Sequence, residues 1–217
     1  MKILVLGATG NVGSRFIARA VHDGHQIIAY ARRPEAVVNS PGITVVGGSA
    51  EDTDALAAAA RGADAILISI TGPMKDHSFM QRTLPTILTA AEHAGVRRLV
   101  LISVFGAGDT AQKASGFARL VYKTALGGFL RDKAASDKLL MSSGVDWTIV
   151  YPVNLKDAAP LPDGATVTPL SEVGRVPGLP TLPFENAAAG ILTVITDSAT
   201  IGQRILLTTP AGWKSAG

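Results

Sequence analysis

A glycine-spaced turn near the start of the chain constrains its fold more than any other feature. An apolar run at residues 3–6 leads into Gly7-Ala8-Thr9-Gly10-Asn11-Val12-Gly13, and apolar residues then recur at helical spacing. Gly7 suits a tight turn, Gly10 lets the backbone approach a ligand, and Gly13 lets the helix pack closely. This spacing between a strand and a helix predicts a site for the pyrophosphate of a dinucleotide, held by the N–H groups at the helix start. The alternative is a turn that only fits a tight corner; the candidate contacts are Gly7, Thr9, Gly10, Asn11, Val12 and Gly13.

The first two thirds of the chain alternates short apolar runs with helical patterns. Helices are expected at 53–61, with Asp52 as its N-cap, and at 79–94 and 130–143; strands are expected at 3–6, 27–31, 43–46, 65–69, 99–103 and 147–151. Strands that are apolar on both faces belong in a parallel sheet covered by helices. The pattern predicts an α/β fold, a Rossmann-type doubly wound parallel sheet whose order switches beside the first strand.

The regular alternation of strand and helix patterns ends after Tyr151. Prolines from Pro152 to Pro183 break the chain into loops, with a helix expected at 185–196 and a strand at 204–207. We therefore expect one Rossmann domain over residues 1–217, with a cofactor-binding core at 1–152 and a small substrate-covering lobe at 153–217. The long connection 105–128, with a helix expected at 117–126, is typical of a segment that covers a site.

Composition excludes several classes of protein and site. The chain has no cysteine, which rules out disulfides, thiolate catalysis and cysteine-bound zinc, and no His/carboxylate cluster has metal-ligand spacing. Its net charge is +3, but the only tight basic pairs are Arg32/Arg33 and Arg97/Arg98, which favours an anionic small molecule over nucleic acid. The apolar runs are too short for a signal segment or a membrane span. We expect a cytoplasmic protein without membrane contact, monomeric or homodimeric.

The end of the expected second strand indicates which dinucleotide binds. Sites that prefer NAD place Asp or Glu there to hold the ribose 2′-hydroxyl, whereas this chain has Arg32 and Arg33. A guanidinium fork matches a phosphate, and a charge-assisted contact contributes about 1.5–3 kcal/mol. The sequence predicts NADP(H) in preference to NAD(H); the alternative is a solvated basic turn.

The residues singled out so far belong to a wider resemblance. Gly7–Gly13, Arg32-Arg33, the stretch 99–103 and Gly144-Val145-Asp146-Trp147-Thr148-Ile149-Val150-Tyr151-Pro152 together resemble the atypical short-chain dehydrogenase/reductases. The most similar branch is the NAD(P)H-binding, NmrA-like group, which includes flavin/biliverdin-IXβ reductases and NADH-flavin reductases. The resemblance covers nearly the whole chain, and it is specific for fold and cofactor and loose for substrate.

The resemblance implies two candidate catalytic residues that also touch the cofactor. Ser103 matches the serine beside the nicotinamide in flavin-reductase-like members. Lys133 falls where related phenylpropenoid reductases keep an active-site lysine. The alternatives are a hydroxyl that bonds the local backbone at the strand end for Ser103 and a solvated helix lysine for Lys133.

Further cofactor contacts follow from the same resemblance. Pro152 matches the proline over the nicotinamide ring, Thr71 and Gly72 match the loop near the ribose, and Ser49 and Ala50 match the loop flanking the adenine. The chain departs from its relatives at Asn154, near where biliverdin-type reductases carry a histidine, so a biliverdin substrate is not supported. It also lacks the Tyr-x-x-x-Lys pair of ordinary short-chain dehydrogenases.

These features imply an NADPH-dependent oxidoreductase that transfers hydride to a small planar acceptor such as a flavin or quinone. Such acceptors take a proton from water or a weak acid, so the missing tyrosine is tolerated. Two alternatives stay open. A non-catalytic NADP(H)-sensing regulator of the NmrA-like kind would share every cofactor residue, and an isomerase or epimerase on the same fold would need the pair that is absent.

Overall fold

One eight-stranded sheet organises the chain, in the order β3-β2-β1-β4-β5-β6-β11-β8. The computed structural model describes residues 1–216, with side chains throughout except at 121–125. Neighbouring strands run parallel except β8, which is antiparallel to β11. The predicted Rossmann-type α/β class is confirmed. The strands are β1 (Lys2–Leu6), β2 (Gln26–Ala31), β3 (Ile43–Gly47), β4 (Ala65–Ile68), β5 (Arg98–Ile102), β6 (Asp146–Pro152), β8 (Thr166–Pro169) and β11 (Gln203–Thr208).

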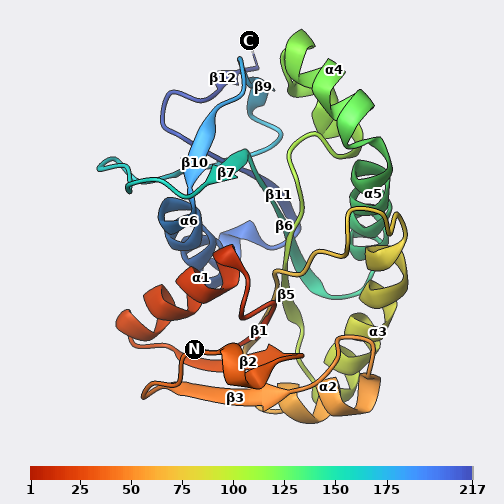
Figure 1. The fold of residues 1–217 in the computed structure, drawn as a ribbon, viewed down its shortest axis with the longest axis vertical. Helices are drawn as coiled ribbons and strands as arrows, with labels where there is room; N and C mark the ends of the chain where they lie inside the picture. The colour runs from red at the N-terminus through yellow and green to blue at the C-terminus, as the bar shows by residue number, and fades with distance from the viewer. Residues whose placement is uncertain (217) are drawn as a thin grey trace.

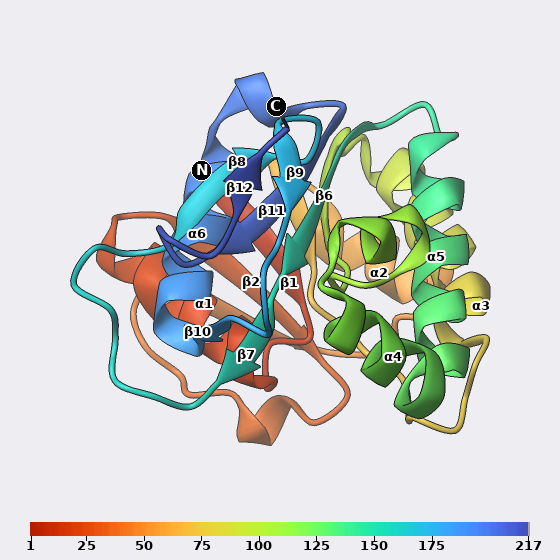
Figure 2. The same ribbon diagram turned by 90° about the horizontal axis from the view of Figure 1, so that it is seen from above.

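Helices cover both faces of the sheet, as Figure 2 shows from above. On one face α1 (Asn11–His22) packs on α6 (Phe184–Thr196). On the other lie α2 (Thr53–Ala60), α3 (Phe79–Ala94) and α5 (Gly127–Met141), each packed on its neighbour. The central strands β4 and β5 are buried along their whole length because helices shield both of their faces. This burial explains why they read as continuous apolar runs.

Local signals set the start of α2 and the end of α3 where the sequence predicts them, whereas the helix expected at 130–143 is α5, which begins at Gly127 and ends at Met141. The Asp52 side chain accepts a hydrogen bond from Ala55 N at 3.0 Å, so it caps α2 as expected. Gly95 adopts a left-handed conformation (φ 73°) that ends α3. The expected helix in the long connection after β5 is α4 (Gly116–Ala125), which follows a 3₁₀ segment at Gly108–Lys113. Figure 1 shows α4 beside α5 at one end of the molecule.

The segment after residue 152 is built into the main sheet more than we expected from its prolines. It supplies β11, β8 and the helix α6, and its remaining strands form two small two-stranded sheets. Those strands, which the sequence did not indicate, are β7 (Asn154–Lys156), β9 (Val173–Arg175), β10 (Thr181–Pro183) and β12 (Lys214–Ser215). The role of this segment as a substrate-covering lobe stays a prediction.

Arg15 ties this C-terminal segment to the first helix. Its guanidinium bonds Asp157 at 2.9 Å and Glu185 at 3.2 Å, and it stacks 5.1 Å from the centre of the Phe184 ring. The start of α6 is therefore held against α1, immediately behind the glycine-spaced turn. No helix of the described chain is both long and apolar enough to cross a membrane.

Candidate cofactor and active site

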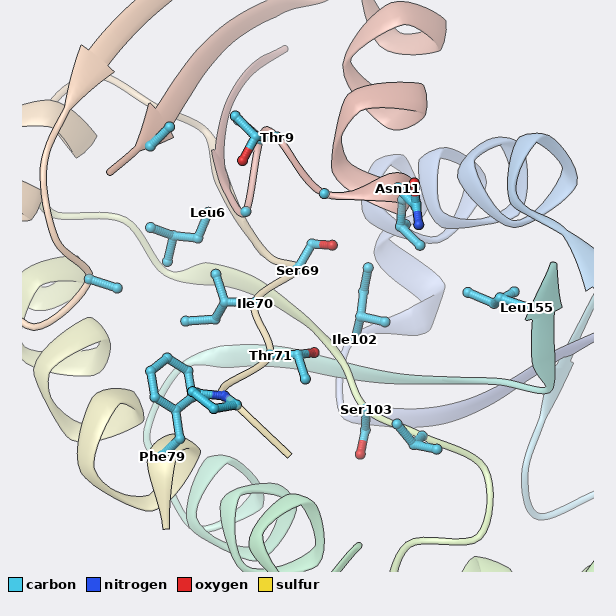
Figure 3. A pocket seen from close by; sticks show the side chains of 18 of the residues that line it. Leu6, Thr9, Asn11, Ser69, Ile70, Thr71, Phe79, Ile102, Ser103 and Leu155 are labelled. Atoms are coloured by element: carbon cyan, nitrogen blue, oxygen red, sulfur yellow. The ribbon is translucent and has the colours of Figure 1, made fainter. Parts of the chain in front are cut away.

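A cavity opens at the carboxyl ends of the parallel strands, where sheets of this kind bind ligands. Its volume is about 940 Å³, near the top of the range of about 300–1,000 Å³ that is typical of small-molecule sites. Figure 3 shows Thr9 and Asn11 at the top of the view, Phe79 at the lower left, Ser103 at the bottom and Leu155 at the right, all lining the cavity. Most of the residues selected from the sequence line it: Gly7, Thr9, Gly10, Asn11, Val12, Arg32, Arg33, Ser49, Ala50, Thr71, Ser103 and Pro152.

The glycine-spaced turn is held in place by close main-chain contacts. Gly7 has φ 87°, and a Cβ atom there would lie 2.1 Å from the Ser69 carbonyl oxygen at the end of β4. A Cβ atom on Gly13 would lie 2.2 Å from the Gly7 carbonyl oxygen. Only glycine fits at these two positions, so the loop can lie between β1, β4 and α1. Gly13 acts in this packing and does not line the cavity.

The first turn of α1 faces the cavity. Gly10 is the N-cap and has no side chain to bond the first N–H groups of the helix. Gly10, Asn11 and Val12 all line the cavity, so the positive end of the helix dipole lies at its wall. This arrangement suits a phosphate group.

The end of β2 forms the charged part of the cavity. Arg32 and Arg33 are exposed and line it, and Ser49 and Ala50 lie on the adjacent loop after β3. Tyr30 supports this loop from below, because its hydroxyl donates to the Ser49 carbonyl oxygen at 3.1 Å. Tyr30 is not among the residues predicted from the sequence, although a tyrosine inside a buried strand needs such an acceptor.

Two further charged residues at this end were also missed. Arg82 of α3 bonds both carboxylate oxygens of Asp76, at 3.1 and 2.7 Å, and both residues line the cavity. The Arg82 guanidinium lowers the pKa of Asp76 to about 2. The pair fixes the loop that follows β4. In that loop a Cβ atom on Gly72 would lie 2.4 Å from the Phe79 side chain, so Gly72 makes room for Phe79, which lines the cavity in its place.

Ser103 lies at the floor of the cavity and belongs to a buried polar network. Its Oγ donates to Oδ2 of Asp137 at 2.9 Å, and the Tyr151 hydroxyl donates to the same oxygen at 2.9 Å. Burial raises the pKa of the Asp137 carboxyl to about 6. Asp137 stands one helical turn after Lys133, and this spacing was the available sequence signal for a shared face.

Lys133 lies behind the strand ends. It is 1% exposed, and its Nζ donates to the carbonyl oxygens of Ile70 at 3.1 Å and Ile102 at 3.3 Å. Burial lowers the pKa of Lys133 to about 8, opposed by the charges of Asp137 and Asp132. The alternative of a solvated lysine is therefore wrong. Lys133 joins the ends of β4 and β5 and is not among the residues that line the cavity; its roles in catalysis and cofactor binding stay predictions.

The far end of the cavity is apolar and uncharged in the part of the chain that the structure describes. The charged lining residues are Arg32, Arg33, Glu51, Asp76 and Arg82. They come from the ends of β2 and β3, the loop after β4 and α3, and Arg82 interacts with both Asp76 and Glu51. The lining residues that follow Ser103 in the chain carry no charge and are apolar except for Asn154: Val104, Phe105, Leu126, Pro152, Val153, Asn154, Leu155 and Leu179. This end can accommodate a flat apolar molecule beside Ser103.

The second basic pair does not form an anion site. Arg98 is buried and donates to the main-chain oxygens of Asp146 and Val194 and to the hydroxyls of Thr148 and Thr200. The interpretation of Arg97/Arg98 as a ligand-binding pair is therefore wrong for Arg98, because the fold itself uses its donors. Among the described residues no cluster of three or more His, Asp or Glu side chains is placed to hold a metal ion.

Comparison with known proteins agrees with this geometry. The model of an NAD(P)H-binding family matches residues 7–197. A (4-alkanoyl-5-oxo-2,5-dihydrofuran-3-yl)methyl phosphate reductase of Streptomyces griseus is 33% identical over 151 residues, which are 69% of this chain and 46% of that protein. This chain thus spans about half the length of that relative.

Two solved structures share the fold. ChuY, an anaerobilin reductase of Escherichia coli O157:H7, is 25% identical and superposes with a TM-score of 0.78, over 97% of this chain and 98% of that one. A short-chain dehydrogenase/reductase of Veillonella parvula in complex with NADP is 18% identical, with a TM-score of 0.80 over 98% and 96% of the two chains. The family match spans the glycine-spaced turn, the cavity floor and the whole of α6, and the chain belongs to this NAD(P)H-binding family.

Proposed function

We propose that the chain is an NADPH-dependent reductase that transfers hydride to a planar, uncharged acceptor such as a quinone or an isoalloxazine ring. One observation carries this proposal. A single cavity joins a phosphate-binding turn flanked by two arginines to an uncharged apolar end at Ser103. A long two-part site of this kind suits a dinucleotide at one end and a flat acceptor at the other.

The residues of the charged end fit NADPH. The glycines leave a cradle that Cβ atoms would fill, and the N-terminus of α1 offers main-chain N–H groups for the pyrophosphate. Arg32 and Arg33 would hold the 2′-phosphate, since a guanidinium pairs with phosphate through two hydrogen bonds. Ser49 and Ala50 would flank the adenine, with Tyr30 keeping their loop in place.

The residues of the apolar end favour an acceptor without charge. A bound nicotinamide supplies the hydride, while the chain supplies position and a dry wall. An anionic group placed among Val104, Phe105 and Leu179 would lose its hydration without gaining a partner. Neutral quinones and riboflavin therefore fit this end better than acceptors that carry a phosphate or carboxylates there.

Turnover with a defined set of acceptors tests the proposal. The purified chain would be mixed with NADPH and, in turn, an uncharged quinone, riboflavin and FMN, and the loss of reduced nicotinamide followed by absorbance. We expect steady consumption with the quinone or riboflavin and a lower kcat/KM with FMN, because its phosphate adds charge. Tight NADPH binding without turnover of any acceptor would contradict the proposal and indicate a sensor of the cofactor.

A further inference from the structure

Asp137 is a buried carboxylate that the fold bonds on one side only. Its Oδ2 accepts from Ser103 Oγ and from the Tyr151 hydroxyl, both at 2.9 Å. Its Oδ1 has no hydrogen-bond partner among the described residues, although the side chain is buried. A buried polar atom without a partner destabilises the fold, because it loses its hydration and gains no hydrogen bond in return. Such an atom calls for an explanation in terms of function.

A second carboxylate on the same helix shows what a purely structural role looks like. Asp132 of α5 accepts from the main-chain N of Met80 at 2.9 Å and of Gln81 at 3.2 Å, one on each oxygen. It thereby binds the N-terminal N–H groups of α3. Both carboxylate oxygens of Asp132 therefore accept hydrogen bonds from the fold. Asp137, in contrast, has one oxygen without a partner among the described residues, and its other oxygen accepts a hydrogen bond from Ser103, which lines the cavity.

The donors around Asp137 have a fixed direction. Arg204 Nε donates to the Tyr151 hydroxyl at 3.3 Å, so the tyrosine proton is directed at Asp137. Burial raises the pKa of Tyr151, and the tyrosine stays protonated. The oxygen of Tyr151 is therefore occupied by Arg204. If Asp137 carries a proton on Oδ2, its available acceptor is Ser103 Oγ.

The Ser103 hydroxyl proton accordingly has two orientations. While Asp137 is ionised, that proton is held inward on Oδ2. When Asp137 is protonated, it donates to Ser103 Oγ, and the Ser103 proton is released toward the cavity that Ser103 lines. One buried carboxyl group thus decides whether the floor of the cavity presents a donor.

We propose that Asp137 holds the proton that the acceptor needs and delivers it through Ser103. The inference rests on the proposed reductase function. In the step, the acceptor gains a hydride from the bound cofactor and a proton from Ser103 Oγ. Ser103 regains a proton from Asp137, which is left as a carboxylate and is protonated again from water in the emptied cavity. The sum is NADPH, acceptor and one proton giving NADP⁺ and the reduced acceptor.

The charges that face Asp137 set the direction of its pH dependence. Burial raises its pKa to about 6, while hydrogen bonds from Ser103 and Tyr151 and the charges of Lys133 and Arg204 lower it. These groups come from the residue after β5 and from β6, α5 and β11, and Arg204 is itself paired with Asp109. Because the protonated form is the active one, turnover is expected to fall as the pH rises above the Asp137 pKa.

The test compares pH profiles of kcat for the full chain, Asp137→Asn, Tyr151→Phe and Ser136→Ala. Asn has no proton to give, so kcat should fall about a hundredfold, the size of a general-acid contribution, and lose its pH limb while the KM for NADPH is kept. Tyr151→Phe removes a donor to the ionised form, so the limb should move to higher pH by about one unit. Ser136 is buried on the same helix, and among the described residues its hydroxyl bonds only the Lys133 carbonyl, so its variant should keep the profile of the parent.

A measurement without cofactor or acceptor complements the kinetics. The infrared carbonyl band of a protonated carboxyl should titrate near the Asp137 pKa in the free protein and should be absent in Asp137→Asn. In Tyr151→Phe the midpoint of this titration should move to higher pH. A pH limb that persists in Asp137→Asn, or no titrating band, would overturn the relay and leave the reductase in place. NADPH binding without turnover of any acceptor would overturn the proposed function and the delivery step with it.

Discussion

A Cβ atom on Gly13 would lie 2.2 Å from the carbonyl oxygen of Gly7, so the first turn of α1 rests directly on the turn that ends β1. The contacted atom is main chain and cannot rotate away as the end of a side chain would. Gly13→Ala should therefore push the turn out of position. We expect the free energy of unfolding to fall by about 1–3 kcal/mol, which is the usual cost of overpacking. The free energy of NADPH binding should weaken by at least the same amount.

Gly144→Ala is the matched control, because a Cβ atom there meets nothing within 4 Å. Chemical denaturation and calorimetric titration with NADPH measure both effects. The close approach would be disproved as a constraint if Gly13→Ala bound NADPH and unfolded like the parent chain.

The Arg32→Ala/Arg33→Ala variant tests which cofactor the charged end selects. Both side chains line the cavity, and a charge-assisted contact to phosphate contributes about 1.5–3 kcal/mol. The dissociation constant for NADPH should rise about tenfold to a hundredfold, while that for NADH, which has no 2′-phosphate, should change little. Arg61→Ala, exposed and outside the cavity, should leave both constants unchanged. Equal losses for NADPH and NADH would contradict the assignment of the arginines.

The fold could be predicted where the sequence signal is local. β4 and residues 99–102 of β5 are buried on both faces and therefore read as unbroken apolar runs, and a capping aspartate and a terminal glycine mark α2 and α3. The strands β9 and β12 have three and two residues and pair across about forty residues of chain. Such short strands carry no alternation, and only their distant partners define them.

The residues of the site also differ in whether a local sequence signal predicts them. Gly7, Gly10 and Arg32 were found because main-chain geometry and strand ends place them, and these are readable in sequence. The network of Ser103, Asp137, Tyr151 and Arg204 was not found as a unit, since its members come from four elements. Nothing in the sequence distinguishes Arg98 from its neighbour Arg97, although one is buried and the other exposed.

Arg98 and Arg97 therefore offer a direct comparison of buried and exposed charge. Arg98→Leu should lower the free energy of unfolding by about 2–4 kcal/mol, because three buried acceptors and one half-buried acceptor on β6, α6 and the following turn each lose a hydrogen bond. The Arg97 side chain is 69% exposed, and its pair with Asp146 is 3.3 Å long. Arg97→Leu should change stability by about 0.5 kcal/mol or less. Urea denaturation of both variants measures this, and similar losses would refute the contrast.

The raised pKa of Asp137 predicts a pH-dependent effect on stability. The unfolded chain ionises this carboxyl near its model value of 3.8 and the folded chain only near about 6. The unfolded state therefore releases the proton first, and the parent chain loses stability as the pH rises through this window. Each pKa unit corresponds to about 1.4 kcal/mol, so the loss reaches ~3 kcal/mol at most.

Asp137→Asn removes that loss. Relative to the parent, its free energy of unfolding should increase between about pH 4 and pH 6 and stay higher at neutral pH. Denaturation at several pH values measures the difference, with Ser136→Ala, which removes no ionisable group, as a control whose difference from the parent should not vary with pH. A difference for Asp137→Asn that is equally flat would show that the carboxyl is not perturbed in the fold.

Leu179→Asp tests whether the apolar end receives the acceptor. Leu179 lines the cavity and is 39% exposed, and Ile201, equally exposed, lies outside it. A carboxylate at position 179 adds charge beside the acceptor without reaching the phosphate-binding turn, so kcat/KM for an uncharged quinone should fall about tenfold or more, which corresponds to about 1.4 kcal/mol. The dissociation constant for NADPH should stay the same, and Ile201→Asp should leave both quantities unchanged. If Leu179→Asp weakened NADPH binding and left the acceptor kinetics intact, the two ends of the cavity would have to be assigned the other way round.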